Sequence, residues 1–221
     1  MKKHVRGVLV AGLCCVAATG AVGQFGANYF KKPNIANIFH PVVGEGSVFQ
    51  MTEKDGTTRE MTWATVAKDS VDGKEAYWIE MTMNDKGRDM VAKMLFTKDD
   101  FQYHKMIMMM PKMPQPMEMD MTPSAEDQKK NQDELSKWHS VGTETITVPA
   151  GTFSCDHWKK DTGDDDVWAS PKVTPLGLVK QQGKNSSMVL IKQVSGVTDK
   201  ITGTPMKMDG MMQQMMKNRN Q

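Results

Sequence analysis

Cys155 and His157 are the two neighbouring residues in this sequence whose types best suit chemistry. They lie two positions apart on a predicted strand, so their side chains would point to the same side, and a thiol could sit beside a base or a second metal ligand. The other histidines beyond the N-terminal region (His40, His104, His139) are scattered, and no second cluster has metal-binding spacing. A lone cysteine packs well as a small hydrophobic residue. We therefore predict no catalytic residues, no cofactor and no enzyme activity.

The acidic run "DTGDDD" (residues 161–166) is a second candidate, because carboxylates bind calcium. An EF-hand loop needs oxygens at alternating positions, a glycine at position six and a glutamate at position twelve. The run lacks that pattern and lies where a hairpin turn is expected. We predict a solvated turn.

Methionine is the most unusual feature of the composition. Fourteen of the 22 methionines fall in two clusters, eight within residues 106–121 and six within residues 206–216. Thioethers are soft ligands that suit Cu(I), and M-x-M spacing allows neighbouring sulfurs to converge. A soft-metal site for Cu(I) or Ag(I) would use Met113, Met117, Met119 and Met121.

An adaptable apolar lining is the interpretation we favour over metal binding. Beyond residue 23 the chain holds 21 methionines and five leucines, and flexible, polarisable methionine suits surfaces that accept varied partners. A sacrificial role, in which sulfoxide formation absorbs oxidant, is the third alternative. The candidate lining residues lie on two predicted strands: Ile79, Met81, Met83, Met106, Met108 and Met110.

The elements that position these residues read as antiparallel strands. From residue 44 onward, short alternating runs are separated by Asp/Gly/Asn/Lys turns, the pattern of successive hairpins. In "YWIEMTM", Tyr77, Ile79 and Met81 form an apolar side, and the side that carries Glu80 is predicted to face water.

The middle and end of the chain break this pattern. Prolines within residues 111–123 predict an extended loop, and "SAEDQKKNQDELSKW" predicts one helix of about three turns. Together they form an insertion over 111–136. Strands then resume, for about ten in total, and the methionine-rich tail 199–221 is predicted to be disordered or a short helix. Strand counting fits both a closed sandwich and a curved open sheet.

The text "GTETITVPAGTFSCDHWKKD" followed by "DVWASPKVTPLGLVKQQ" resembles bacterial exported domains of unknown function in the lipoprotein-carrier-like superfamily. The resemblance covers roughly residues 139–195. It implies a strongly curved antiparallel sheet, a half-barrel closed by helix over an apolar cavity, with an acyl or lipid-like ligand. Its structural motif residues here are Pro149, Gly151, Phe153, Cys155 and Trp168; Pro149 and Gly151 suit a tight turn.

The N-terminus predicts export. Residues 1–23 have a basic start, a short apolar stretch and small residues before a cleavage point between Gly23 and Gln24, which is typical of a signal peptide. No later segment is apolar enough for a transmembrane span. Three basic residues lie in 1–23, so the remainder has 25 Lys+Arg against 26 Asp+Glu, a balance of −1 that gives no electrostatic case for nucleic acid.

The predicted organisation is therefore a signal peptide (1–23), a lead-in (24–43), one β-sheet domain (44–198) and the tail. We expect a periplasmic or secreted protein. Its partner would be an apolar small molecule or lipid, or another protein of the envelope; in the last case the chain would be a structural or interaction module of the envelope.

Overall fold

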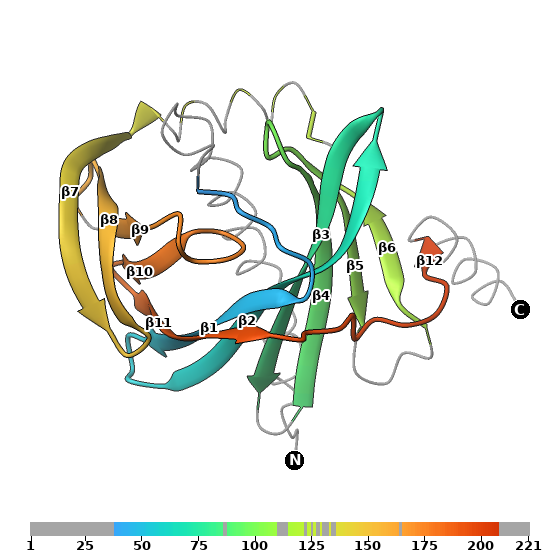
Figure 1. Ribbon diagram of the computed structural model, residues 1–221, viewed down its shortest axis with the longest axis horizontal. Coiled ribbons are helices and arrows are strands. Elements are labelled where there is room, and N and C mark those ends of the chain that lie inside the picture. The colour runs from blue at the N-terminus through green and yellow to red at the C-terminus, as the bar shows by residue number, and fades with distance from the viewer. Residues whose placement is uncertain are drawn as a thin grey trace, which may run out of the picture.

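A computed structural model shows one sheet of twelve strands that curves around an interior (Figure 1). The structure describes residues 38–85, 88–109, 115–121, 123–124, 126, 129, 133, 136–163 and 165–207. The predicted signal peptide, most of the lead-in and the last part of the tail lie outside this range. The strands are β1 (Glu45–Glu53), β2 (Thr58–Val71), β3 (Lys74–Asp85), β4 (Arg88–Thr97), β5 (Tyr103–Met109), β6 (Met117–Asp120), β7 (Trp138–Val148), β8 (Gly151–Lys160), β9 (Asp166–Ala169), β10 (Leu178–Gln182), β11 (Ser186–Ser195) and β12 (Met206–Lys207).

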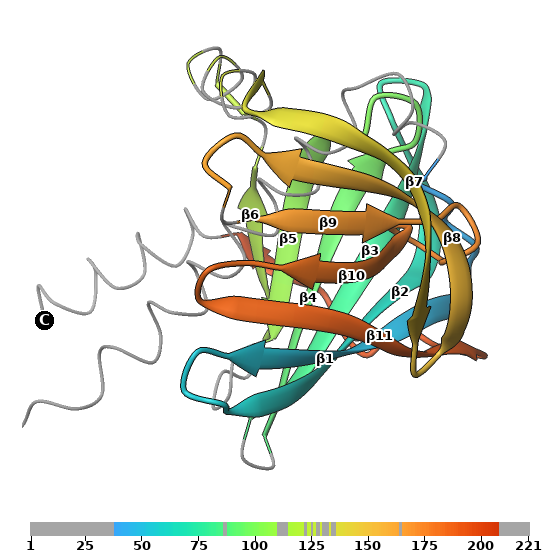
Figure 2. The same ribbon diagram turned by 90° about the vertical axis from the view of Figure 1, so that its left-hand side faces the viewer.

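The sheet consists of two meanders joined side by side. Its order is β12-β6-β5-β4-β3-β2-β1-β11-β10-β9-β8-β7, so the first meander runs from β1 to β6 and the second from β7 to β11. They meet where β1 pairs antiparallel with β11, and β12 joins β6 in parallel. Figure 2 shows β1 and β11 lying next to each other between the two groups. This confirms the prediction of a mainly β, strongly curved antiparallel sheet, with twelve strands rather than ten.

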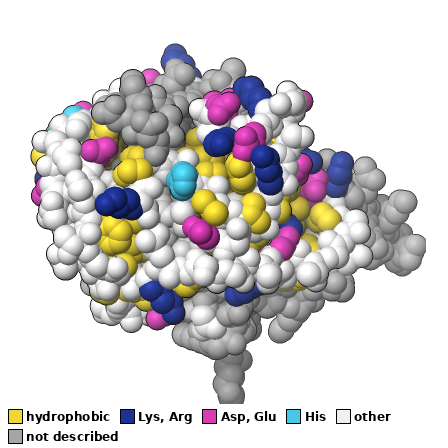
Figure 3. All heavy atoms as spheres, in the orientation of Figure 1, with side chains coloured by type: hydrophobic (Ala, Val, Ile, Leu, Met, Phe, Trp, Pro, Cys, Tyr) yellow, Lys and Arg dark blue, Asp and Glu magenta, His cyan; other side chains and the backbone are white. Residues whose placement is uncertain are grey.

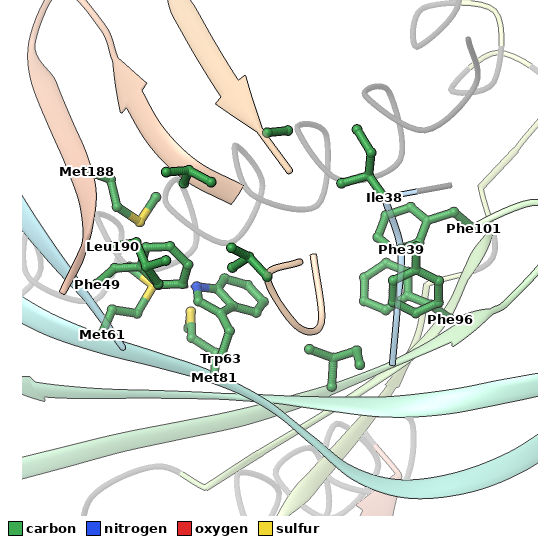
Figure 4. Packing of buried hydrophobic residues seen from close by; sticks show 14 of the residues in the cluster. Ile38, Phe39, Phe49, Met61, Trp63, Met81, Phe96, Phe101, Met188 and Leu190 are labelled. Carbon is green, nitrogen blue, oxygen red and sulfur yellow. The ribbon is translucent and has the colours of Figure 1, made fainter. Parts of the chain in front are cut away.

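Large apolar side chains fill the interior near the junction of the meanders. Figure 4 shows Phe49, Trp63, Met81, Met188 and Leu190 converging from β1, β2, β3 and β11. Each points inward because alternate residues of a strand face the same side of the sheet. Burial of these side chains is the main stabilising contribution to the fold.

A second apolar group lies around the end of the lead-in. The Phe39 ring meets the Phe101 ring edge-on at 4.7 Å between centroids, and Phe101 stacks on Phe96 at 4.4 Å. Ile38, only 1% exposed, packs beside Gly177 of the loop that joins β9 to β10. The His40 amide donates to the Pro175 carbonyl at 2.9 Å in the same loop. Residues 38–40 and the loop thus occupy the interior from the open side of the curve (Figure 1).

The segment after β11 crosses the outer face of β3 and β4 and covers Glu80. The Lys200 amide donates to the Glu80 carboxylate at 2.9 Å, and Asp199 accepts from Lys93 at 2.5 Å. Glu80 is only 2% exposed, so the prediction that this side of the strand faces water is wrong at this residue. Alternation within one strand could not reveal the covering segment, which comes from far along the chain. Burial, reinforced by the nearby Asp199 carboxylate, raises the pKa of Glu80.

The segment 111–123 is also not wholly a loop. Met117–Asp120 forms β6, which pairs with β5 from Lys105↔Asp120 to Met108↔Met117. These four residues lie between Pro116 and Pro123, and each has an amide available for the ladder. In the predicted helix, the described positions Glu126, Lys129, Asp133 and Ser136 are helical. No helix in the part of the chain that the structure describes is long and apolar enough to cross a membrane.

Candidate functional site

The inner side of β2 to β6 carries a continuous surface of methionines. Cross-strand pairing places Met61 beside Met83 and Met83 beside Met90 in one row. The next row runs Trp63, Met81, Ala92, Met108, Met117 and Met206, and the third runs Ile79, Met94, Met106 and Met119. We call this surface the methionine face: Met61, Met81, Met83, Met90, Met94, Met106, Met108, Met117, Met119 and Met206.

Burial across the methionine face changes from one end to the other. Met81, Met94, Met106 and Met117 are buried, whereas Met90, Met108, Met119 and Met206 are half-buried. Met90 lies on β4, and the other three half-buried residues lie on β5, β6 and β12, the last strands at this end of the sheet. We call Met108, Met119 and Met206 the lip. Apolar side chains therefore continue from the packed interior to a partly solvent-accessible border.

The structure brings together most of the predicted lining residues. Ile79, Met81 and Met83 of β3 lie on the same side as Met106 and Met108 of β5, as alternation along each strand requires. Met110 lies outside the described residues. Sequence reasoning missed Met94, although it falls at the alternate positions of β4, and Met206, which only the distant pairing of β12 with β6 places here.

The predicted metal set is divided by the structure. Met117 and Met119 both face inward from β6, but Met121 follows the strand, and its side chain is 36% exposed. The Met121 amide donates to the His104 carbonyl at 2.9 Å, which holds this residue at the end of the β5–β6 ladder. Met113 lies outside the described residues. Across the described ranges, no three His, Cys, Asp or Glu side chains gather in a way that could hold a metal ion.

Cys155 lies in the core of the second meander. It is 1% exposed, and its thiol donates a weak hydrogen bond to the Phe153 carbonyl at 3.7 Å. Burial raises the pKa of the thiol to about 11, with smaller contributions from the Glu144 and Asp156 carboxylates. Because the thiolate is the reactive form, this cysteine is a poor nucleophile at neutral pH.

His157 binds partners other than Cys155. Its Nδ1 lies 2.9 Å from Glu144 Oε1 and its Nε2 lies 2.8 Å from Asp166 Oδ1, while its ring stacks on Trp168 at 4.4 Å. Carboxylate oxygens only accept, so both hydrogen bonds form together when both ring nitrogens carry protons. This arrangement connects β7, β8 and β9, which is a structural role.

Cys155 and His157 have different surroundings, although the ladder between them is regular: Cys155 pairs with Glu144 and His157 with Gly142. The β7–β8 register shifts between Ser140 and Gly142, and Val141 is the extra residue. Along β8, alternate residues are buried up to Cys155, but His157 is half-buried and the next buried residue is Trp158. The predicted shared direction of two alternate side chains therefore does not produce a shared environment.

The remaining motif residues serve the second meander. Pro149 lies in the turn between β7 and β8, Gly151 begins β8 with φ of +131°, and Phe153 packs in the core. Trp168 donates from Nε1 to Glu144 and has the Lys180 ammonium 4.7 Å from its ring centroid. The acidic run lies at the β8–β9 turn, where the Gly163 amide donates to the Lys160 carbonyl at 2.8 Å.

A pocket of about 290 Å³ lies near the β2–β3 turn, and most of the residues that line it are polar or charged. It contains charges of both signs, and its Lys74 is paired with Asp100 at 2.9 Å. Its lining differs entirely from the methionine face: Val71, Asp72, Lys74, Thr97, Gln102, His104, Lys105 and Asp120.

Comparisons with known proteins give distant similarities. No protein-family model and no curated protein matches the chain. A "putative exported protein" with a YmcC-like fold from Bacteroides fragilis is 17% identical, covering 71% of this chain and 98% of that one, with a TM-score of 0.38. A "putative lipoprotein" from Parabacteroides distasonis is 16% identical, with the same coverage and a TM-score of 0.37.

MucB is 10% identical, covering 86% of this chain and 63% of its own, with a TM-score of 0.38. All three TM-scores are below 0.5, so these similarities do not assign the chain to a family. Membership of the lipoprotein-carrier-like superfamily stays a prediction. Fold and site define a mainly β protein whose curved sheet carries methionines along one inner wall.

Proposed function

We propose that this chain is an exported, non-enzymatic binding protein that holds an apolar, acyl-like ligand against its methionine face. The observation that carries the proposal is the lip. Met108, Met119 and Met206 leave apolar surface partly accessible at the border of a buried apolar wall. Unbranched thioether side chains adapt their shape to varied apolar partners.

The chemistry of this wall favours an apolar ligand over a polar one. Glu118 and Asp120 alternate with Met117 and Met119 on β6, so their carboxylates lie on the opposite side of the sheet. A ligand at the lip would therefore meet sulfur and carbon. Burying about ten methylene groups would contribute roughly 8 kcal/mol, before the cost of ordering and immobilising the chain.

Figure 3 shows hydrophobic side chains at several places on this face of the molecule, among charged ones. Near the β1–β11 junction, by contrast, Phe49, Trp63 and Leu190 fill the interior with their own side chains (Figure 4). The lip, rather than that packed region, is where we place the ligand.

Displacement of a fluorescent fatty acid from the purified protein tests the proposal. Met119→Lys places an ammonium at the lip and should weaken binding more than tenfold. Thr145→Lys, which adds the same charge at an exposed position of β7, should leave it unchanged. Absence of fatty-acid binding by the unaltered protein, or equal binding by Met119→Lys, would refute the proposal.

Export rests on the pattern of residues 1–23 and has its own test. Expressed in a bacterium with its natural N-terminus, the protein should be recovered outside the cytoplasm with Gln24 as its first residue. An intact N-terminus on cytoplasmic protein would overturn this part of the proposal without affecting ligand binding.

A further inference from the structure

We propose that Met106, Met108, Met117 and Met119 form a binding site for a soft monovalent cation, Cu(I) or its analogue Ag(I). Met106 is the direct cross-strand partner of Met119, and Met108 is the partner of Met117. The two pairs lie two residues apart on the same face of β5 and β6. The site is independent of the apolar ligand proposed above, although the two share part of the methionine face.

The spacing of these four residues suits convergence of their sulfurs. Directly opposed Cβ atoms lie about 5 Å apart across strands, and alternate residues lie about 7 Å apart along a strand. The four Cβ atoms therefore mark a small rectangle. Each thioether sulfur is two bonds beyond its Cβ on an unbranched side chain, which is long enough for all four sulfurs to reach the centre of the rectangle.

The donor set selects a soft ion over a hard one. Thioether ligands favour Cu(I), whereas Mg²⁺ and Ca²⁺ require oxygen ligands. The oxygens of Glu118 and Asp120 lie on the opposite side of β6. A hard cation at the four methionines would find neutral sulfur and no carboxylate from this strand.

Burial separates a protected side of the site from an accessible one. Met106 and Met117 are buried, whereas Met108 and Met119 are half-buried. Two sulfurs thus lie away from water and two lie where an ion can arrive. Met94 and Met206 lie next to the set as the cross-strand partners of Met106 and Met117, so further thioethers flank it.

A thioether on this inner side already acts as an acceptor. The Trp63 indole donates from Nε1 to the Met61 sulfur at 2.9 Å. Met61 is therefore engaged by a hydrogen bond. It is not part of the proposed set.

Silver titration of a cysteine-free chain is the decisive experiment, because thiols bind Ag(I) strongly. Cys14, Cys15 and Cys155 are all replaced by alanine, and one Ag(I) per chain should bind, measured by calorimetry and native mass spectrometry. In that background, Met106→Leu/Met119→Leu and Met108→Leu/Met117→Leu should each weaken binding at least tenfold, and the quadruple variant should lose it.

Met51 and Met188 supply a matched control, because they are also cross-strand partners but lie on β1 and β11. Met51→Leu/Met188→Leu should bind Ag(I) like the background. Leucine retains apolar volume, so the quadruple variant should keep the circular dichroism spectrum of the background chain. Loss of silver binding by a folded quadruple variant would support the metal site whether or not the unaltered protein binds fatty acid.

Three results would overturn the proposal: no Ag(I) binding by the background chain, equal binding by the quadruple variant, or equal loss in the control pair. Methionine-to-leucine changes conserve volume and usually destabilise by less than about 1.5 kcal/mol. If the quadruple variant nevertheless unfolds, X-ray absorption of the silver-loaded background decides. A shell of sulfur alone supports the site, and nitrogen or oxygen ligands contradict it.

Discussion

Replacing Gly177 by alanine will test whether Ile38 fills the interior of the sheet beside the β9–β10 loop. Gly177 has φ of +69°, and an added Cβ would lie 1.6 Å from Ile38 Cγ2 and 3.1 Å from the Ile38 carbonyl oxygen. The left-handed backbone alone disfavours alanine by about 1–2 kcal/mol. Overpacking against Ile38 adds about 1–3 kcal/mol. We therefore expect Gly177→Ala to lower the free energy of unfolding by about 2–5 kcal/mol.

Gly196 separates these two contributions. Its φ is +71°, nearly that of Gly177, and no atom lies within 4 Å of a Cβ added there. Gly196→Ala should therefore lose only the backbone part, about 1–2 kcal/mol. Urea unfolding of both variants, monitored by circular dichroism, gives their free energies of unfolding. The difference in destabilisation between the two variants belongs to the contact with Ile38.

A double-mutant cycle identifies the contact itself. Ile38→Ala removes Cγ2, so in the Gly177→Ala background it should cost about 1–3 kcal/mol less than in the wild type. If Gly177→Ala is no more destabilising than Gly196→Ala, and the cycle shows no coupling, Ile38 does not occupy this position in solution. The interior would then have room for a ligand deeper than the lip.

Three further predictions follow from ionisable groups. Because the pKa of Glu80 is raised in the folded protein, the stability contributed by this side chain is present below the ordinary pKa of a glutamate and is lost as pH rises through the folded value. The Glu80→Gln variant should therefore become more stable relative to wild type as pH rises from about 4 to about 8, measured by urea unfolding. A stability difference that does not change with pH would contradict this prediction. The Tyr77 hydroxyl donates a hydrogen bond to Glu75 and, with nearby lysines, lowers the pKa of the Glu75 carboxyl to about 2. The Tyr77→Phe variant should therefore have a higher Glu75 pKa in an NMR titration of the carboxyl groups. An unchanged Glu75 pKa would show that Tyr77 is not the cause of the lowering. Cys155 should resist iodoacetamide at about pH 8 in the folded protein and react on unfolding, because its thiolate is scarce; equal rates in both states would show that it is exposed.

The sequence predicted the parts of the fold that depend on neighbouring residues. Alternation within "YWIEMTM" identified Ile79, Met81 and Met83 as one face, and the same reasoning joined Met106 to Met108. Turn residues marked the hairpins, including the one at Pro149 and Gly151. These features follow from the period of a strand and from the φ preferences of single residues.

The missed features depend on residues far apart in the chain. Pairing of Met206 with Met117 unites two methionine clusters that are separate in sequence, and no local pattern encodes that register. Burial of Glu80 comes from the segment at Asp199. The surroundings of His157 come from Glu144 of β7 and from Asp166 and Trp168 of β9, which the spacing of Cys155 and His157 within one strand could not predict.

The junction of β1 with β11 has a consequence for how the chain folds. Each meander can form from hairpins between consecutive strands, but Glu45 must find Ser195 before the two can become one sheet. Closing so long a loop is entropically unfavourable, and folding slows as contacts become less local. We expect two early, hairpin-rich units and a late docking step. An exported chain with this topology would complete its sheet only after nearly all of it had crossed the membrane.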